Sequence, residues 1–301
     1  MEIIEINLND VQKLDRIAAC IGYFDGMHIG HAQLIKETLN QAKKNNLKSA
    51  CITFHPDPWC VLKNLHNIPH ISSMDERIEI GRECGLDYWI ILPFTTELSK
   101  MSTSDFEKLL FNMNIQTLIC GFDYSYGYKG QGKIDTLKKQ SYFDVIVVDE
   151  VTYNNEKISS TRIEKEIMNG NMSEVNCLLG RLYSIQGWVV DGRKLGKTIG
   201  FPTANIKCKY HSILPKAGVY IGYINIDDIQ YKCMINIGHN PTFNYQNNIS
   251  IEVNIIDFDQ NIYGKEIQLF FNQRLRDEKK FQSKEELIAQ LKIDALKAKN
   301  Q

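Results

Sequence analysis

Two histidines, His28 and His31, stand three residues apart in a stretch that could bind phosphate. Before them lies a short apolar run, residues 17–21. After them apolar residues recur every three or four positions, as they do on one face of a helix. Residues 22–31 are therefore predicted to form a turn from a strand into a helix. The N–H groups and the positive dipole end of such a helix favour an anion. Imidazoles placed there can stabilise negative charge on a phosphorus centre.

Three glycines in this turn, Gly22, Gly26 and Gly30, would let the backbone bend sharply and approach a ligand closely. Taken alone, the turn indicates an anion or nucleotide site, and two other interpretations stay open. The histidines could simply be a polar helix start. They could also belong to a zinc site, but neither a glutamate between them nor a nearby cysteine pair supplies the third ligand that zinc would need.

Length and composition are those of a globular protein with about two domains. Of the 301 residues, 43% are hydrophobic and 24% are charged, which is enough to bury real cores. The 35 Lys and Arg against 36 Asp and Glu disfavour non-specific nucleic-acid binding. The start lacks the features of a signal peptide, and no run approaches the ~18 apolar residues of a membrane helix. We therefore expect a cytoplasmic protein with no membrane partner. The eight cysteines form no C-x-x-C pair and are expected to be buried free thiols.

In the first half of the chain, apolar runs of strand length alternate with helical patterns. The predicted strands are 17–21, 49–54, 88–92, 117–120 and 145–148, and the predicted helices are 28–46, 74–84, 104–113 and 133–140. This alternation predicts an α/β domain whose parallel sheet carries helices on both faces. In such sheets ligands bind beyond the carboxyl ends of the strands.

Three segments that follow predicted strands could therefore contribute to a site. The two prolines of residues 54–58 predict a rigid loop. Residues 121–127 and 129–132 combine four glycines with three aromatic residues, which suits a flexible loop that closes over a planar ring system. The hydroxyls of residues 159–161, followed by Arg162, are either an ordinary helix N-cap or ligands for phosphate oxygens.

The second half of the chain changes character near residue 182. Two helical patterns, 160–169 and 173–179, come before this boundary. Short β-type runs follow at 183–190, 218–226, 230–237, 249–256 and 266–272, and a helical pattern at 283–299 comes last. Several antiparallel strands followed by one helix predict a compact barrel.

The densest motif of this half is the glycine-rich segment 187–205. Its glycines would let the backbone approach phosphates. Thr203 and Asn205 offer two oxygen ligands that suit Mg²⁺ shared with ATP. The segment is one residue short of a Walker A loop, and as pure structure it could be two hairpin turns. Glu252 could be an outward-facing strand carboxylate or a base that accepts a hydroxyl proton.

Several of these motifs resemble those of one family. Residues 22–31 read Gly-x-Phe-Asp-Gly-x-His-x-Gly-His, which is similar to the signature of the HxGH nucleotidyltransferases in the longer form of their flavin branch. Residues 158–163 resemble the element that closes the nucleotide site there. Residues 187–205 resemble the signature of riboflavin kinases, and so do residues 235–243 and 275–281. Over nearly its whole length the chain is similar to the bifunctional bacterial riboflavin kinase/FMN adenylyltransferase (FAD synthetase) family.

The resemblance implies a Rossmann-like nucleotidyltransferase domain over residues 1–182 and a six-stranded antiparallel β-barrel kinase domain with a terminal helix over residues 183–301. It implies phosphorylation of riboflavin by ATP to FMN, then adenylylation of FMN by ATP to FAD with release of pyrophosphate. Riboflavin, FMN and ATP are the implied small-molecule partners, Mg²⁺ is the implied cofactor, and no nucleic acid is involved. The oligomeric state stays open, with a weak homo-oligomer as one alternative.

The resemblance also implies which residues form the sites. Those expected to act in catalysis are Glu252 as the kinase base, His28, His31 and Arg162. Those expected to bind ATP or phosphate are Gly22, Phe24, Asp25, Gly26, Gly30, Ser159, Ser160, Thr161, Gly192, Gly196, Gly200 and Pro202. Those expected to contact flavin are Asp123, Tyr124, Tyr126, Arg276 and Glu278. Thr203 and Asn205 are expected to bind the metal with the nucleotide.

Two departures from the family pattern matter. Tyr124 and Tyr126 replace phenylalanines and keep the aromatic faces. Asp57 stands where the family usually has a histidine. The change at Asp57 leaves open an enzyme that keeps the kinase but whose first half has another acceptor or no activity. A flavin- or nucleotide-binding regulator is a further alternative, which the presence of Glu252 disfavours because binding alone needs no base.

Overall fold

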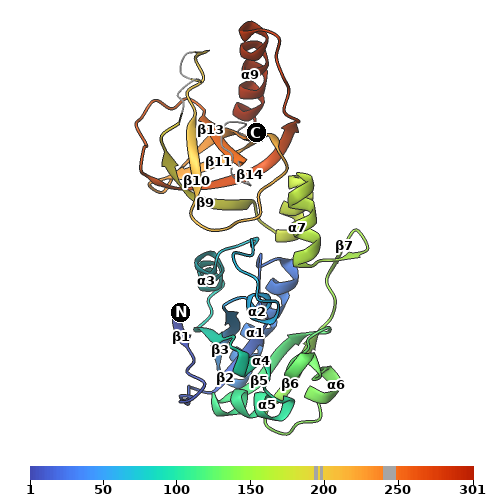
Figure 1. Cartoon of the computed structure of the whole chain (residues 1–301). Helices are drawn as coiled ribbons and strands as arrows, with labels where there is room; N and C mark the ends of the chain where they lie inside the picture. The colour runs from blue at the N-terminus through green and yellow to red at the C-terminus, as the bar shows by residue number, and fades with distance from the viewer. Residues whose placement is uncertain (193–195, 197–198, 240–248) are drawn as a thin grey trace. The chain divides into compact units, whose positions relative to one another are not determined.

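A computed structural model describes residues 1–192, 196, 199–239 and 249–301. The chain divides into two compact units (Figure 1). The first unit comprises Met1–Ile68 and Ser73–Ser159, and the second comprises Pro69–Ser72 and Ser160–Gln301.

The first unit contains a six-stranded sheet in which every neighbouring pair of strands is parallel. In spatial order its strands are β1 (Glu2–Glu5), β4 (Tyr88–Pro93), β3 (Lys48–His55), β2 (Ile17–Ile21), β5 (Ile115–Gly121) and β6 (Asp144–Val148). The chain runs outward from β2 through β3 to β4 and then crosses to β5 on the other side of β2. The carboxyl ends of β2 and β5 therefore flank the switch point at which α/β sheets bind ligands.

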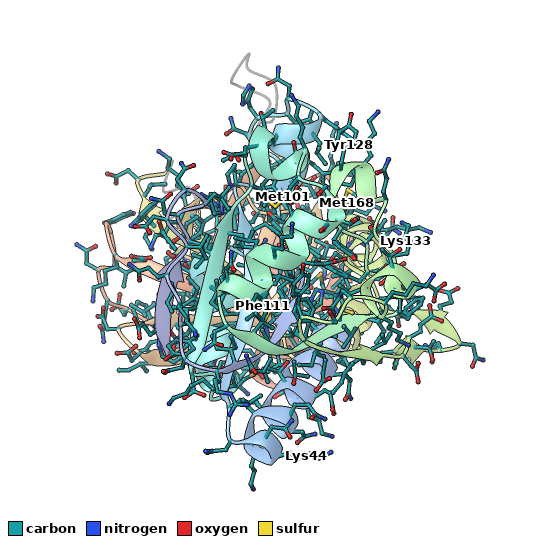
Figure 2. All side chains as sticks on the ribbon, turned by 90° about the horizontal axis from the view of Figure 1, so that it is seen from below. Lys44, Met101, Phe111, Tyr128, Lys133 and Met168 are labelled. Carbon is teal, nitrogen blue, oxygen red and sulfur yellow. The ribbon has the colours of Figure 1, made fainter. Side chains whose placement is uncertain are left out.

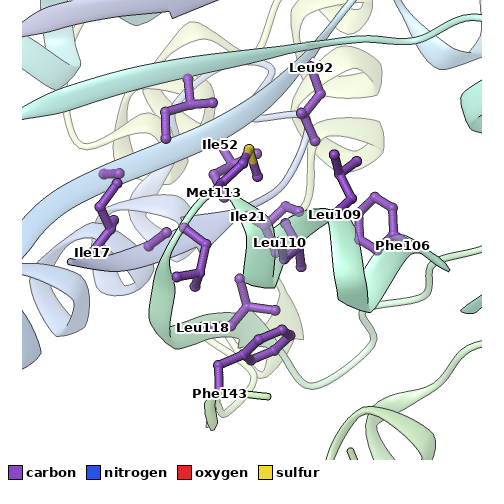
Figure 3. Packing of buried hydrophobic residues seen from close by; sticks show 14 of the residues in the cluster. Ile17, Ile21, Ile52, Leu92, Phe106, Leu109, Leu110, Met113, Leu118 and Phe143 are labelled. Atoms are coloured by element: carbon purple, nitrogen blue, oxygen red, sulfur yellow. The ribbon is translucent and has the colours of Figure 1, made fainter. Parts of the chain in front are cut away.

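Helices cover both faces of this sheet. They are α1 (Ile29–Asn45), α2 (Pro58–Leu62), α3 (Met74–Glu83), α4 (Thr96–Ser99), α5 (Thr103–Asn112) and α6 (Ile134–Leu137), with a 3₁₀ turn at Tyr128–Gly130 and a small hairpin of β7 (Thr152–Tyr153) and β8 (Glu156–Lys157). Residues of β2 alternate between two apolar clusters. Cys20 packs with residues of α1 and α3, whereas Ile21 packs with Leu110 and its neighbours on α5 (Figure 3). Because both faces of β2 are buried, the turn that follows it starts from a rigid base.

The two ends of α1 differ in charge. Its last turn carries Lys43 and Lys44, which suit the negative end of the helix dipole; Lys44 is labelled near the end of the helix in Figure 2. Its first turn carries no acidic residue. No carboxylate in the first turn of α1 therefore competes with a bound anion for the positive end of the helix dipole.

The second unit contains a closed barrel in which all neighbouring strands are antiparallel. Around the barrel the strands are β10 (Ala204–Cys208), β13 (Ile249–Ile255), β12 (Ile229–His239), β11 (Gly218–Ile226), β14 (Glu266–Arg276) and β9 (Tyr183–Val190). In β14 the alternate residues Ile267, Leu269 and Phe271 are buried, as expected for the inner face of a barrel. The terminal helix α9 (Lys284–Lys299) packs against β11 and β12.

Helices α7 (Ser160–Asn169) and α8 (Met172–Leu179) belong to the second unit. Asn176 of α8 explains this grouping. Its amide donates to the carbonyls of Phe271 and Asn272, at 3.0 Å each, and its carbonyl accepts from the N–H of Tyr183 at 2.8 Å. The compact units therefore divide about twenty residues before the boundary predicted near residue 182, because α8 is bound to β9 and β14.

The predicted fold class is confirmed for both halves. The sequence missed β1, and it missed β10 as a separate run because that strand lies inside the glycine-rich segment. The predicted helix 133–140 was too long. Gln140 instead folds back on the chain, accepting from the N–H groups of Tyr142 and Phe143 and donating to the Phe143 carbonyl, so α6 ends at Leu137.

The expectation that all cysteines are buried was partly wrong. All eight are free, but Cys84 and Cys177 are exposed, and Cys60 and Cys208 are only partly buried.

Asn176→Ala should lower the free energy of unfolding of the second unit by about 1–3 kcal/mol, because two carbonyls and one amide lose their partner. Urea unfolding would measure this free energy, and hydrogen exchange of the β9 and β14 amides would show whether these strands lose protection. Asn225→Ala removes an exposed contact to Gln230 and serves as the matched control, with a change below about 0.5 kcal/mol. Equal effects of the two variants would contradict the anchoring role of Asn176.

Candidate active sites

The turn between β2 and α1 has the form that the sequence predicted. The N–H of Gly22 donates to the carbonyl of Ile52 on β3 at 3.1 Å, so the chain is still tied to the sheet where it leaves β2. Gly26 then has a φ of +79°, in the left-handed region that suits glycine. The predicted phosphate residues Gly22, Gly26 and Gly30 thus lie in one turn at the carboxyl edge of the sheet.

His28 and His31 are brought together at the start of α1. Their rings stack with centroids 3.7 Å apart. His28 is also the N-cap, because its Nδ1 accepts from the N–H of His31 at 3.3 Å. An accepting Nδ1 carries no proton, so the neutral ring carries its proton on Nε2 and can donate from there. The polar-helix-start interpretation and the anion-site interpretation are therefore compatible. A methyl group at Gly30 would crowd the ring of His28, which explains the glycine there.

Phe24 and Asp25, both predicted to bind ATP or phosphate, are buried. The Phe24 ring packs edge-on against His31, with centroids 5.0 Å apart. The Asp25 carboxylate accepts from Arg77 of α3 at 2.8 Å. The phosphate contacts of these two residues stay predictions, and the structure gives each of them a contact inside the protein.

The aromatic segment after β5 begins at the neighbouring strand end. Asp123 is exposed and pairs with Lys157 at 2.5 Å. Tyr126 is only 5% exposed, and its hydroxyl donates to Glu107 at 2.5 Å; burial, followed by the effect of Glu107, raises its pKa. Tyr124 stacks on Tyr126 with centroids 5.9 Å apart. The Tyr126 ring therefore belongs to the core, and its flavin contact stays a prediction.

The predicted hydroxyl and arginine segment marks the start of α7. Ser159 is the last residue of the first unit, whereas Ser160, Thr161 and Arg162 belong to the second. The guanidinium of Arg162 is mostly buried and binds Glu174 of α8 at 2.5 Å.

In the barrel, strand pairing gathers residues that lie far apart in the sequence. Glu252 of β13 is the register partner of Asn205 on β10 and of Asn236 on β12. Directly opposite residues point to the same face of a sheet. The predicted base and a predicted metal ligand are therefore neighbours, with a second amide on the other side of the carboxylate.

Two predicted glycines serve the same cluster. A methyl group at Gly192 would collide with the side chain of Asn205, and one at Gly196 would collide with the Phe201 carbonyl and crowd the Thr203 hydroxyl. Both glycines thus let the segment pass close to the two oxygen ligands. Gly200 has a φ of +81°. Residues 193–195, 197–198 and 240–248, which carry parts of the two kinase-like motifs, lie outside the described residues.

A cavity of about 580 Å³ opens beside Glu252. Its apolar lining comes from the barrel and from α9, and includes Phe201, Met234 and Leu291. Its polar lining comprises Thr203, Asn236, Glu252, Asn254, Arg276, Glu278, Lys279 and Lys284. The predicted flavin residues Arg276 and Glu278 therefore meet the predicted base in one cavity. Pro202 and Thr203 also line a smaller cavity of about 130 Å³.

Comparison with known proteins identifies the family of each half. A riboflavin kinase family model matches residues 179–301, and an FAD synthetase family model matches residues 10–162. The bifunctional riboflavin kinase/FMN adenylyltransferase of Listeria monocytogenes is 39% identical, covering 96% of this chain and 93% of that protein. The Bacillus subtilis protein of the same name is 34% identical over 92% of this chain and 90% of its own.

The chain belongs to the bifunctional riboflavin kinase/FMN adenylyltransferase family.

A solved structure agrees with this fold over the full length. A crystal structure described as a macrolide-efflux protein from Streptococcus pneumoniae has a TM-score of 0.94 and 33% identity, covering 99% of each chain. In the part of this chain that the structure describes, no helix is long and apolar enough to cross a membrane. Within those same residues, no group of three or more His, Cys, Asp or Glu is arranged to hold a metal ion.

Three residues that contact these sites were missed by the sequence reasoning. Asn236 lies inside a segment that resembled the bifunctional family, so that motif was the available signal. Arg77 and Asp294 carried no signal, because each stands among charged residues on a helix and looks like surface charge. The structure buries both.

Asp294 of α9 holds Arg276 at the edge of the larger cavity. Its carboxylate accepts from Arg276 Nε at 2.9 Å, from Arg276 Nη2 at 2.8 Å and from Gln290 at 2.9 Å. Asp294 is 1% exposed, whereas the Arg276 side chain is 21% exposed. This pair therefore ties the terminal helix to the end of β14.

Asp294→Ala should destabilise the second unit by about 3 kcal/mol, the lower end for a broken buried pair, because Arg276 keeps some access to water. Urea unfolding would measure it. Asp257→Asn, which removes an exposed ion pair to Lys299 and tolerates the φ of +53° there, is the control and should cost less than about 1 kcal/mol. A loss in Asp294→Ala no larger than in the control would contradict this assignment.

Proposed function

We propose that this chain makes FAD in two steps, phosphorylating riboflavin to FMN and then adenylylating FMN, each at the expense of ATP. The arrangement of Asn205, Glu252 and Asn236 across three neighbouring strands beside one cavity carries the proposal for the kinase. The stacked histidines at the start of α1 carry it for the adenylyltransferase. Both family models support the pairing of the two activities.

In the kinase site, riboflavin occupies the larger cavity. A mostly apolar cavity with a few convergent polar groups suits a planar aromatic ring with a polar chain. Glu252 is placed to accept the proton of the ribityl 5′-hydroxyl as that oxygen attacks the γ-phosphorus of ATP. Thr203 lines both cavities. The nucleotide phosphates are therefore proposed to meet the hydroxyl beside Thr203.

The side chains at this site fit Mg²⁺, which prefers oxygen ligands and usually keeps part of its shell for substrate phosphates. Thr203 and Asn205 supply two such oxygens, and Gly192 and Gly196 leave the space that these side chains require. When bound, the ion would neutralise charge on the β- and γ-phosphates.

The adenylyltransferase reaction makes a different demand. Its nucleophile, the FMN phosphate, is already ionised and needs no base. Positioning and charge stabilisation at the α-phosphorus are therefore the whole task. We assign this task to His28, His31 and the N-terminus of α1. The role of Arg162 as a phosphate ligand stays a prediction. Asp123 and Tyr124 are proposed to contact the flavin.

The two catalytic regions are proposed to divide near residue 182, just inside the riboflavin kinase match that begins at residue 179. A cytoplasmic location and a weak homo-oligomer stay predictions.

Glu252→Gln should lower kcat for riboflavin phosphorylation by about 10²–10⁴ and leave KM for riboflavin nearly unchanged, because the amide cannot accept the proton. Initial rates of FMN formation at saturating ATP and Mg²⁺ would measure it. Glu266→Gln, at an exposed ion pair on β14, is the matched control and should behave as wild type. A wild-type rate in Glu252→Gln would remove the base from the mechanism.

His28→Ala should stop the pathway at FMN, slowing FAD formation by about 10²–10³ through loss of one charge-stabilising donor. Riboflavin, ATP and Mg²⁺ would be incubated with the protein, and riboflavin, FMN and FAD resolved over time. Wild-type protein should form FMN before FAD, and the exposed-histidine control His66→Ala should match it.

The same time course separates the alternatives. Wild-type protein that accumulates FMN without FAD would mean that the first half is inactive or has another acceptor. Bound flavin with no product at all would contradict the enzyme and favour a regulator.

A further inference from the structure

We propose that Arg77 of α3 is a positioning residue for adenylyl transfer, a role that rests on the function proposed above. Arg77 lies in the first unit and is 2% exposed. It holds the turn between β2 and α1 in the conformation that presents His28, His31 and the helix N-terminus to phosphate.

The Arg77 guanidinium donates hydrogen bonds to two residues of the turn. Its Nη1 donates to the backbone carbonyl of Tyr23 at 3.2 Å, and its Nη2 donates to the carboxylate of Asp25 at 2.8 Å. These two residues flank Phe24. A planar, forked cation is the side chain that can make both bonds at once.

Phe24, the residue between Tyr23 and Asp25, has a backbone conformation that its surroundings must stabilise. Phe24 has a φ of +59°, a left-handed conformation that is uncommon for a bulky residue and persists only where the surroundings enforce it. Its ring is fully buried and lies against the rings of Trp89 and His31. If the backbone at Phe24 relaxed, the ring would move, and the His31 imidazole packed on it would lose its support.

Further contacts near Arg77 also involve Tyr23. The Thr53 hydroxyl donates to the Tyr23 carbonyl at 3.1 Å, and the Arg77 guanidinium lies 4.6 Å from the centroid of the Tyr23 ring. Burial raises the pKa of Tyr23; Arg77 opposes the rise and Asp57 adds to it. Asp57, the departure from the family pattern, is thus a second buried acid beside Tyr23.

Stability alone does not account for the buried ion pair of Arg77 and Asp25. A buried ion pair adds little over apolar residues of the same size, because taking both charges out of water costs nearly as much as their attraction returns. What the pair does supply is one fixed geometry. Here the fixed geometry is that of the turn that carries the histidines.

The test compares Arg77→Met and Arg77→Lys with Arg82→Met. Arg82 lies on the same helix in an exposed pair with Glu79 and is the matched control. For each protein, kcat and KM for ATP are measured in FMN adenylylation. Riboflavin phosphorylation by the same preparation reports whether the second unit is folded, and hydrogen exchange of the β2, β3 and β5 amides reports whether the first unit is folded. Hydrogen exchange of residues 22–31 reports the order of the turn without relying on activity.

Arg77→Met should lower kcat/KM for ATP in adenylylation by about 100-fold, the loss expected when reacting groups shift by about 1 Å. Riboflavin phosphorylation should stay within twofold of wild type, and residues 22–31 should exchange faster. Arg77→Lys keeps a charge opposite Asp25 but cannot make both bonds, so it should fall between Arg77→Met and wild type. Arg82→Met should match wild type in every readout.

Wild-type adenylylation kinetics in Arg77→Met would overturn the proposal. A second outcome would also overturn it. In that outcome, Arg77→Lys loses adenylylation only in proportion to its unfolded fraction, and residues 22–31 of the folded protein exchange hydrogen at the wild-type rate. If the wild-type chain forms no FAD, the proposed function fails instead. The exchange of residues 22–31 then still decides whether Arg77 holds the turn.

Discussion

The antiparallel pairing of β13 with both β10 and β12 is the constraint on which the kinase site depends. It places Glu252 between Asn205 and Asn236, three residues that come from three separate parts of the chain. A slip of one residue in either pairing would turn the carboxylate and its neighbours to opposite faces of the barrel. The barrel is closed, and closure removes free edges at which such a slip could occur. The geometry around the proposed base is therefore a property of the whole barrel.

A different physical device serves the first unit. Here the proposed reactive groups, His28 and His31, stand on a turn, and a turn has no ladder of hydrogen bonds to keep it in place. The buried ring of Phe24 and the paired charges of Asp25 and Arg77 take over that task. The parallel sheet contributes a rigid starting point at Ile21 and a neighbouring strand end at β5. Both lie where α/β sheets admit ligands.

The two proposed reactions make opposite demands on carboxylates. An alcohol must lose a proton to attack phosphorus, so the barrel places a carboxylate beside the cavity. A phosphate nucleophile is already charged, and a free carboxylate beside it would repel it. The acid nearest to the histidines in the sequence, Asp25, is bound to Arg77 inside the protein. The carboxylate of Glu252 beside the cavity thus suits an alcohol nucleophile, and the paired carboxylate of Asp25 suits a phosphate nucleophile.

The sequence by itself determined the fold class of each half, the strand-to-helix turn at residues 22–31 and most of the barrel strands. These follow from local periodicity and from the chemistry of glycine and histidine, which a short window of sequence contains. Tertiary structure alone decided that Asn236 stands beside Glu252 and that Asp294 and Arg77 are buried partners rather than surface charges. It also placed Tyr126 in the core, where the sequence had suggested an aromatic face for flavin. Burial and ion pairing depend on residues distant along the chain, so a charge on a helix looks the same in sequence whether water or another charge lies opposite.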